Sequence, residues 1–404
     1  MLDTLRDIRH ITSTPQRGCT RLAYTHFEDQ AHDYVWDKLR ALDGLAREED
    51  AAGNTFIVPA GSLHTDKPIV LIGSHLDTVI EGGWLDGALG VVAGMYALRG
   101  RADGGVADAH VGLVIFRDEE GVRFNTGLFG SGVFAGGCTP DDLEVVSTDG
   151  VRLHDVVRDP EGCCRYRPPV RAAAFLECHI EQGERLPAHD CRVGVVSGIV
   201  GIRRFELVGQ GMANHAGTTD MRRRLDALVP VADVVARSPG LVEDLEDAVV
   251  TCGRMQVEPG APNIVPGRAS AIVEIRGRDD ATLDAIEQRL RSLIADLGPA
   301  VSGGRCARVA MESIVSVAPI PTDATLNDHL AEILEERKIA FRRMASMAGH
   351  DTQQAARRCD ASMFFIPSID GVSHNPAEDS HEEDIQLAGD LMLAWAERCV
   401  AACL

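Results

Sequence analysis

Basic residues are scarce in this chain. Its 404 residues include 40 lysines and arginines against 61 aspartates and glutamates, so the formal net charge is -21. Proteins that bind nucleic acids need clustered lysine and arginine to hold the phosphates, and we therefore expect no nucleic-acid partner. The hydrophobic fraction of 45% and the charged fraction of 25% are those of globular proteins, which excludes a disordered or collagen-like chain.

Long hydrophobic runs and a leader sequence are also missing. No stretch approaches the roughly 18 consecutive apolar residues that a membrane-spanning helix needs. Residues 1–10 alternate charged and apolar side chains, without the basic start, apolar centre and cleavage site of a signal peptide. The 11 cysteines include no Cys-x-x-Cys pair, which favours reduced thiols over a disulfide framework. The sequence thus predicts a cytoplasmic protein that does not associate with membranes.

The two ends of the chain show the pattern of an α/β domain with a mainly parallel sheet. Short, continuous apolar runs bounded by turn residues are typical of buried parallel strands, and they alternate with helical patterns. The expected strands are 55–58, 68–73, 111–116, 172–176 and 362–366. The expected helices are 31–45, 87–98, 326–337 and 384–399, with a further helix after Gly349.

The middle of the chain has a different pattern, in which polar and apolar residues alternate as in half-solvated strands. The expected strands are 203–208, 249–257, 268–277 and 308–317, and the expected helices are 225–237 and 281–297. This β-α-β-β-α-β order is that of a ferredoxin-like α+β sandwich. We therefore expect a domain of residues 1–202 and 318–404, interrupted by a smaller domain of residues 203–317. Strand 203–208 is expected at a sheet edge, where a second copy could pair with it.

The densest chemical signal follows the expected strand 68–73, in Gly-Ser-His-Leu-Asp-Thr-Val and the glycine-rich turn after it. His75 lies at the carboxyl end of this strand, where ligands gather in open α/β sheets. Its imidazole can bind a divalent metal while Asp77 accepts the other ring N–H and fixes the tautomer. Asp86 lies in the turn, where a carboxylate can approach an ion. Taken alone, a His-x-Asp triplet is usually an ordinary surface feature.

Three consecutive carboxylates, Asp118, Glu119 and Glu120, follow the expected strand 111–116. Side by side at the end of a buried strand they repel one another, so a positive charge should hold them. A metal ion would let one carboxylate be a ligand while its neighbour stays free as a base. A solvated acidic turn is the alternative interpretation.

Two further histidines follow strand-like segments of the same interrupted domain: His179 after 172–176 and His374 after 362–366. Each alone is more simply a structural histidine. Together with the earlier residues they make a set of imidazoles and carboxylates without cysteine, which suits zinc, manganese, cobalt or nickel. The candidate ligands are His75, Asp86, Glu120, His179 and His374.

Motifs spread over nearly the whole chain resemble those of the dinuclear-metal aminoacylase/carboxypeptidase superfamily. His-Ile-Glu-Gln-Gly at 179–183 and His-Ala-Gly-Thr-Thr at 215–219 are similar to the branch of N-carbamoyl-L-amino-acid hydrolases, allantoate amidohydrolases and β-ureidopropionases. The other matching stretches are 18–25, 53–54, 73–79, 82–90, 119–121, 123–124, 130–131, 211–221, 262–266, 349–351 and 367–378.

The resemblance implies two divalent metal ions, without specifying which of zinc, manganese, cobalt or nickel. It implies that His75, Asp86 and His179 hold one ion. Asp86 would bridge to the other ion, which Glu120 and His374 would also hold. Asp77 would then orient the imidazole of His75.

The resemblance also implies the roles of the residues around the metals. Glu119 would be the general base that activates the attacking water. The inserted domain would close as a lid and pair two protomers in a homodimer, and His215 would stabilise the oxyanion, reaching into the partner's site. Gln182, Asn263 and Arg276 would bind the substrate's carboxylate and amide, a task that suits the guanidinium fork of arginine.

The activity that the resemblance implies is metal-dependent hydrolysis of the carbamoyl C–N bond of an N-carbamoyl-L-amino acid or a related ureido acid. Three alternatives stay open: an allantoate amidohydrolase, an aminoacylase- or dipeptidase-type hydrolase on the same site, and a catalytically silent binding protein. The chain departs from the branch at Asp220, where proline is common, and at Met347 and Thr352, where smaller residues are frequent. These departures bear on the choice of substrate.

Overall fold

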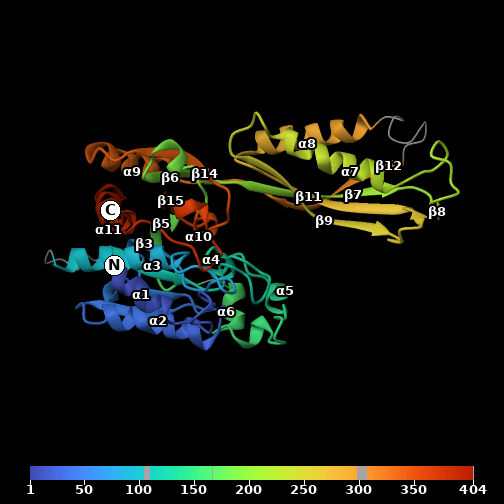
Figure 1. The fold of residues 1–404 in the computed structure, drawn as a ribbon. Helices are drawn as coiled ribbons and strands as arrows, with labels where there is room; N and C mark the ends of the chain where they lie inside the picture. Colours follow the sequence, from blue (N-terminus) through green and yellow to red (C-terminus); the bar gives the residue numbers. More distant parts are fainter. Residues whose placement is uncertain (104–109, 166, 298–306, 404) are drawn as a thin grey trace. The chain divides into compact units, whose positions relative to one another are not determined.

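The computed structural model describes residues 1–103, 110–165, 167–297 and 307–403. The chain forms two compact units (Figure 1). Unit 1 consists of Met1–Ser197, Pro321–Met344 and Gly349–Leu404, and unit 2 consists of Gly198–Ile320 and Ala345–Ala348. Unit 2 thus begins and ends a few residues outside the expected range 203–317, and it takes in one short segment from much later in the chain.

Unit 1 is built on a nine-stranded sheet with the order β1-β2-β4-β3-β5-β15-β6-β13, to which β14 is added by pairing with β6. Its central strands β4, β3, β5 and β15 run parallel, whereas β1, β2 and β6 pair antiparallel with their neighbours. The strands are β1 (Leu45–Glu49), β2 (Thr55–Pro59), β3 (Pro68–His75), β4 (Val111–Phe116), β5 (Arg171–Ile180), β6 (Val193–Ile199), β13 (Ile320–Pro321), β14 (Phe341–Ser346) and β15 (Asp360–Ile366). This mixed, largely parallel sheet confirms the expected α/β class.

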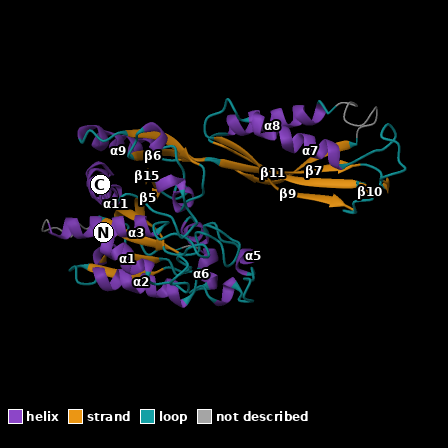
Figure 2. Cartoon of the chain, viewed as in Figure 1, coloured by secondary structure: helices purple, strands orange, loops and turns teal. Residues whose placement is uncertain are grey.

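Helices pack on both faces of this sheet (Figure 2). Alternate residues of β3 point to opposite faces: Val70 and Ile72 join one buried cluster with α1, α2, α3, α9 and α11, while Ile69 and Leu71 join a second cluster with α4 and α10. The helices are α1 (Leu2–Arg9), α2 (His26–Leu39), α3 (Ala88–Asp103), α4 (Phe129–Phe134), α5 (Pro140–Leu143), α6 (Pro160–Arg165), α9 (Ala324–Glu336), α10 (Asp351–Ala355) and α11 (Glu382–Cys403).

One expected helix differs from the structure. Helical spacing predicted a helix over 31–45, but α2 begins at His26 and ends at Leu39, and Leu45–Glu49 forms strand β1. The chain reverses at Gly44, whose φ of +85° suits glycine, and β1 then pairs antiparallel with β2. Leu42 and Leu45 still pack against the main core, from loop and strand positions.

Unit 2 contains a four-stranded antiparallel sheet with the order β12-β7-β11-β9, separate from the main sheet. Two helices cover one face, where Phe205 and Leu207 pack against Val231 and Ile286. The elements are β7 (Gly201–Gln210), α7 (Leu228–Arg237), β9 (Ala248–Glu258), β11 (Arg268–Gly277), α8 (Asp280–Ala295) and β12 (Arg308–Val317). The predicted β-α-β-β-α-β order is therefore the observed one, and a short two-stranded antiparallel sheet of β8 (Asn214–His215) and β10 (Ile264–Val265) is added to it.

The expected edge position of strand 203–208 is wrong. Strand β7 pairs with β11 on one side and with β12 on the other, so it is an interior strand. The edges of this sheet are β9 and β12. Sequence alternation identifies a strand with one solvated face but does not show how many neighbours the strand has.

The parallel centre of unit 1 brings the candidate ligands to one edge of the sheet. Strand β3 ends at His75, β4 ends just before Asp118, β5 ends just after His179, and β15 precedes the loop of His374. The carboxyl ends of parallel strands lie on the same edge, where ligands bind in open α/β sheets. Within the described ranges, no helix is long and apolar enough to cross a membrane.

Candidate metal centre

The carboxylate of Asp86 lies among three histidines. Its Oδ1 is 2.9 Å from Nε2 of His179 and 3.6 Å from Nε2 of His75, while its Oδ2 is 3.3 Å from Nε2 of His374. Nε2 of His374 is also 3.5 Å from Oε2 of Glu120. Asp86 thus directs one carboxylate oxygen toward His75 and His179 and the other toward His374.

Two sets of three side chains have ligand atoms close enough to hold an ion each. In the first, His75, Asp86 and His179 are all buried, and in the second, Asp86 is joined by Glu120 and the exposed His374. The ligand atoms of each set lie within 4.8 Å of one another. The structure therefore brings together all five residues proposed as ligands from the sequence, and Asp86 belongs to both sets.

Hydrogen bonds on the far side of two rings leave Nε2 available toward Asp86. Nδ1 of His75 lies 3.1 Å from the carbonyl oxygen of Asp77, and Nδ1 of His179 lies 2.9 Å from that of Ile180. Each Nδ1–H therefore donates to a carbonyl, and Nε2 faces Asp86; Nε2 of His179 also accepts the N–H of Gly87 at 3.3 Å. Nε2 of His75 and Oε1 of Glu120 are buried without a hydrogen-bond partner in the described part of the chain. These unpartnered atoms fit a pair of divalent cations.

Asp77 holds the acidic loop after β4 by its backbone. Its Oδ1 accepts the N–H of Glu119 and its Oδ2 accepts the N–H of Glu120, each at 3.1 Å. Oδ1 also lies 3.5 Å from Nδ1 of His75. A single buried carboxylate therefore fixes His75, the candidate base and the neighbouring candidate ligand.

The acidic groups at the centre have shifted pKa values. Burial would raise the pKa of Asp86, but the charge of His179 and hydrogen bonds from the three histidines hold it well below its ordinary value. Burial raises the pKa of Glu120 to about 8, and the charge of Asp86 adds to this. For His374, the hydrogen bond to Asp86 is the main reason that its pKa rises to about 9. In the metal-free protein, protons bound to Glu120 and His374 thus offset part of the negative charge of the carboxylates.

Glu119 differs from the ligand set in its position and surroundings. Its Oε2 lies 3.7 Å from Nε2 of His75, and it belongs to neither candidate set of ligands. Burial raises the pKa of Glu119 well above its ordinary value, and the nearby carboxylates of Asp351 and Glu120 raise it further against the lowering effect of His75. A carboxyl group that gains a proton this readily is suited to proton transfer.

Sequence reasoning gave no role to the buried Glu177, which ties three segments together beneath the site. Its Oε1 accepts the hydroxyl of Ser74, and its Oε2 accepts both the N–H and the hydroxyl of Thr352. Thr352, one of the departures from the branch, thus contacts the protein core. The ring of His350 also packs 4.5 Å from that of His179. Both Glu177 and His350 lie in motifs visible in the sequence, but their contacts depend on the fold.

Gln182, expected to bind substrate, contacts a candidate ligand. Its Nε2 donates to Oδ2 of Asp86 at 2.8 Å and to the hydroxyl of Ser373 at 3.3 Å. Its Oε1 is buried without a hydrogen-bond partner among the described residues. The amide therefore sits beside the metal centre, within reach of a group that binds there.

In unit 2, His215 lies in β8, which pairs with β10, and Asn263 directly precedes β10; Figure 1 labels β8. The carbonyl of Asn263 accepts the N–H of Ala216. The exposed ring of His215 accepts at Nδ1 the N–H groups of Gly217 and Thr218, at 3.1 and 3.2 Å. The neutral ring then carries its proton on Nε2 and can donate it in a hydrogen bond.

Arg276 lies near the end of β11, whereas β10 precedes its start. It is eight residues beyond Arg268, which corresponds to about 26 Å along a strand. Its guanidinium donates to Oε1 of Glu274 at 2.8 Å and to the carbonyl of Met347 at 2.6 Å. Within unit 2, the structure therefore does not bring Arg276 together with Asn263.

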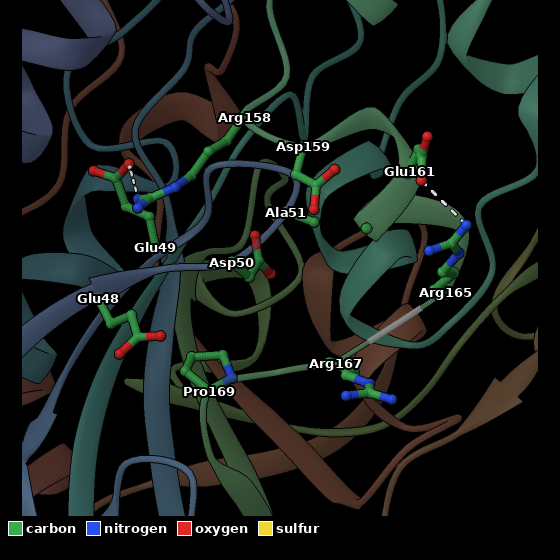
Figure 3. Close-up of a pocket in the computed structure, with 11 residues that line it drawn as sticks. Glu48, Glu49, Asp50, Ala51, Arg158, Asp159, Glu161, Arg165, Arg167 and Pro169 are labelled. Atoms are coloured by element: carbon green, nitrogen blue, oxygen red, sulfur yellow. Dashed lines mark hydrogen bonds and ion pairs between the residues drawn. The ribbon is translucent and has the colours of Figure 1, made fainter.

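A separate pocket of about 760 Å³ lies elsewhere in unit 1, lined by residues from the β1–β2 connection and from α6 (Figure 3). Two of its arginines pair with acidic neighbours: Arg158 with Glu49 at 2.8 Å and Arg165 with Glu161 at 3.1 Å. None of its lining residues is a candidate ligand. We therefore locate the chemistry of this protein at the histidine centre.

Residues 71–398 match the profile of a known family, Peptidase family M20/M25/M40. This range includes all five candidate ligands and most of the chain. The chain belongs to the M20 family. The resemblance inferred from the sequence motifs is thereby confirmed.

Relatives and solved structures agree on the branch of the family. The chain is 32% identical over 394 residues to the N-carbamoyl-L-amino acid amidohydrolase of Geobacillus stearothermophilus, covering 96% of this chain and 95% of the relative. It is 33% identical over 379 residues to the allantoate amidohydrolase of Bacillus subtilis, covering 92% and 90%. A hydantoinase/carbamoylase family amidase from Burkholderia multivorans superposes with a TM-score of 0.85 at 32% identity, covering 98% and 96%. This member of the M20 family is therefore a metallo-amidohydrolase of the hydantoinase/carbamoylase branch.

Proposed function

We propose that this M20 enzyme hydrolyses the carbamoyl C–N bond of an N-carbamoyl-L-amino acid or a related ureido acid. The observation that carries the proposal is the position of Asp86 between two sets of ligand atoms, with Glu119 beside them. A relative of nearly the same length bears the name of an N-carbamoyl-L-amino acid amidohydrolase. In the reaction, one water and one carbamoyl amino acid give the free amino acid, carbon dioxide and ammonia.

Two divalent ions are held, in this proposal, by the two sets of residues that share Asp86. His75 and His179 complete one set, and Glu120 and His374 complete the other. When bound, such ions make water more acidic and polarise the carbonyl that is attacked. The donor set of imidazoles and carboxylates accepts zinc, manganese, cobalt or nickel.

Glu119 moves the proton in the proposed mechanism. Its carboxylate takes a proton from the attacking water and returns it to the leaving nitrogen of the substrate. The hydrogen bond from its N–H to Asp77 holds it next to the ligands without making it one of them. The division of roles between adjacent glutamates lets one carboxylate remain available as a base.

Substrate recognition, in this proposal, draws on both units. Arg276 binds the substrate's carboxylate through its guanidinium fork, and Gln182 and Asn263 bind polar groups of the substrate. His215 donates its Nε2–H to the oxyanion, a use favoured by the two N–H groups that occupy its Nδ1.

A homodimer formed through unit 2 would complete this site. Asn263 precedes the start of β11, whereas Arg276 lies near its other end, roughly 26 Å along the strand from Arg268, which exceeds the length of a carbamoyl amino acid. One substrate can contact both residues only if they come from two chains. We therefore propose that His215 and Asn263 act in the site of a partner subunit.

The experiment that tests the function is a panel of ureido compounds with ammonia detection. Purified protein is supplied in turn with zinc, manganese, cobalt or nickel and assayed on N-carbamoyl-L-amino acids, ureidopropionate and allantoate. We expect hydrolysis of a carbamoyl amino acid by the metal-loaded wild type and none after chelation. A protein that binds metal but hydrolyses none of these compounds would refute the proposal.

Allantoate hydrolysis is the second candidate. The chain is 33% identical to an allantoate amidohydrolase and 32% identical to the N-carbamoyl-L-amino acid amidohydrolase, so sequence identity does not favour either activity. Allantoate is also a ureido acid, so the same base and ligands would serve. The ratio of kcat/KM for allantoate to that for carbamoyl amino acids decides between the two. A ratio far above one would assign the enzyme to allantoate.

A further inference from the structure

The buried carboxylate of Glu378 connects the two loops that supply Asp86 and His374. It lies four residues after His374, and its residue is 1% exposed. Its Oε1 accepts the backbone N–H groups of Leu85 and Asp86, each at 3.0 Å. Its Oε2 accepts the hydroxyl of Ser373 at 2.9 Å and the N–H of His374 at 3.3 Å. One carboxylate oxygen of Glu378 thus accepts hydrogen bonds from the loop of Asp86, and the other accepts them from the loop of His374.

The path of the chain at Gly83 makes room for this carboxylate. A Cβ atom built on Gly83 would lie 2.0 Å from both Cδ and Oε1 of Glu378, which is far inside van der Waals contact. Any larger residue at position 83 would push the carboxylate away from the N–H groups of Leu85 and Asp86. The glycine-rich turn before Asp86 therefore admits the Glu378 side chain.

His374 depends on this connection more than the other histidines do. His75 and His179 lie within strands β3 and β5 and are buried. His374 lies in a loop, has a side chain that is 49% exposed, and adopts a φ of +54°, which is uncommon for a residue with a Cβ. Its backbone N–H has the carboxylate of Glu378 as its partner.

We infer that Glu378 is a positioning residue that fixes His374 against Asp86 and so maintains the ion site of Asp86, Glu120 and His374. This inference rests on the proposed two-metal function. It assigns Glu378 no contact with metal or substrate. Residues that orient metal ligands typically contribute 10–100-fold to metal affinity. Glu378 also holds the N–H of Asp86, which both sites share, so we expect the larger loss, rather than the whole loss, at the site that includes His374.

The test is Glu378→Gln in the full-length chain, loaded with manganese and dialysed against graded concentrations of chelator. The glutamine nitrogen cannot accept hydrogen bonds, so one loop loses its acceptor while side-chain volume is kept. We expect elemental analysis to show two ions per wild-type chain and one per variant chain, with 10–100-fold weaker binding of the other ion. Glu383→Gln, an exposed change in α11, is the matched control and should keep both ions.

Ser373→Ala provides a milder variant, because it leaves the carboxylate of Glu378 in place and removes a hydroxyl that lies 2.9 Å from Oε2 of Glu378 and 3.2 Å from Oδ2 of Asp86. We expect a smaller loss at the same ion site and an unchanged melting temperature of the metal-free protein. Two ions bound with wild-type affinity in Glu378→Gln, or equal weakening of both ions, would overturn the inference. A wild-type chain that binds no ion at all would instead overturn the proposed function.

Discussion

Unit 1 and unit 2 hold their candidate functional residues in different ways. In unit 1, His75 and His179 are buried at the ends of parallel strands and are fixed by hydrogen bonds, and Asp86 is buried in the turn after β3. In unit 2, His215 is exposed in the two-residue strand β8 and Arg276 lies on a partly solvated sheet. In the proposed function, the metal ligands are therefore preorganised within unit 1, whereas substrate recognition also uses surface groups of unit 2. Variants in the two units should therefore change different kinetic parameters.

The largest effect should come from Glu119→Gln in unit 1. Loss of the proton-transferring carboxylate should lower kcat by about 10²–10⁴-fold, with metal content unchanged because Glu119 belongs to neither candidate ligand set. Steady-state kinetics and elemental analysis on the same preparation check both parts. An active Glu119→Gln enzyme would remove the proposed base.

A change in unit 2 should act on KM. Arg276→Ala removes a charged hydrogen-bond donor worth about 1.5–3 kcal/mol, so KM should rise about 10–100-fold while metal content stays at two ions. Arg278→Ala, two residues on and about half exposed, is the control and should leave KM unchanged. An equal fall in metal content for Arg276→Ala would show that the two units do not divide the work in this way.

Metal affinity in unit 1 should depend on pH. The pKa of His374 is about 9, raised mainly by its hydrogen bond to Asp86, and burial raises that of Glu120 to about 8. Protons occupy these groups below those pKa values, so ion binding must release them, and affinity should fall as pH falls from about 9 to about 6. Both groups belong to the same candidate ion set, so below about pH 8 that ion displaces two protons and its affinity should fall by up to about a hundredfold per pH unit. Calorimetric titrations in buffers of different ionisation enthalpy measure the release, and a flat profile would contradict the assignment of His374.

The contribution of a partner subunit should appear when two inactive variants are mixed. Glu119→Gln lacks the base, and His215→Ala lacks the proposed oxyanion donor. If His215 acts in the partner's site, random mixing by unfolding and refolding should restore about a quarter of wild-type activity. No recovery, or a protein that light scattering shows to be monomeric, would place His215 in its own chain's site or remove its role.

Much of the division into two units, and of the candidate metal centre, was predictable from the sequence because it depends on local patterns. Continuous apolar runs such as 111–116 identified the buried strands, and polar residues soon after them indicated the candidate ligands near the carboxyl ends. The change to alternating patterns near residue 203 marked the inserted fold. Family motifs then supplied the roles of residues such as Glu119 and Gln182.

The remaining features depend on contacts between distant segments. The hydrogen bond from Asp86 to Glu378 joins residues 292 positions apart, and no periodicity in either segment indicates it. The interior position of β7 was missed because alternation reports faces and not neighbours. The early end of α2 was missed because helical spacing continued across Gly44 into a strand that pairs with β2.

The carboxylate of Asp77 accepts hydrogen bonds from two consecutive peptide N–H groups, and this constrains how the loop can change in evolution. Neighbouring α-carbons along a chain are always about 3.8 Å apart, so the spacing between Glu119 and Glu120 is set by covalent chemistry. Loops around the centre can lengthen, shorten or exchange residues without altering that interval. A single-residue deletion in this loop would change which side chains follow the two N–H groups that Asp77 accepts, whereas a substitution such as Glu119→Gln can change one carboxylate and leave the other in place.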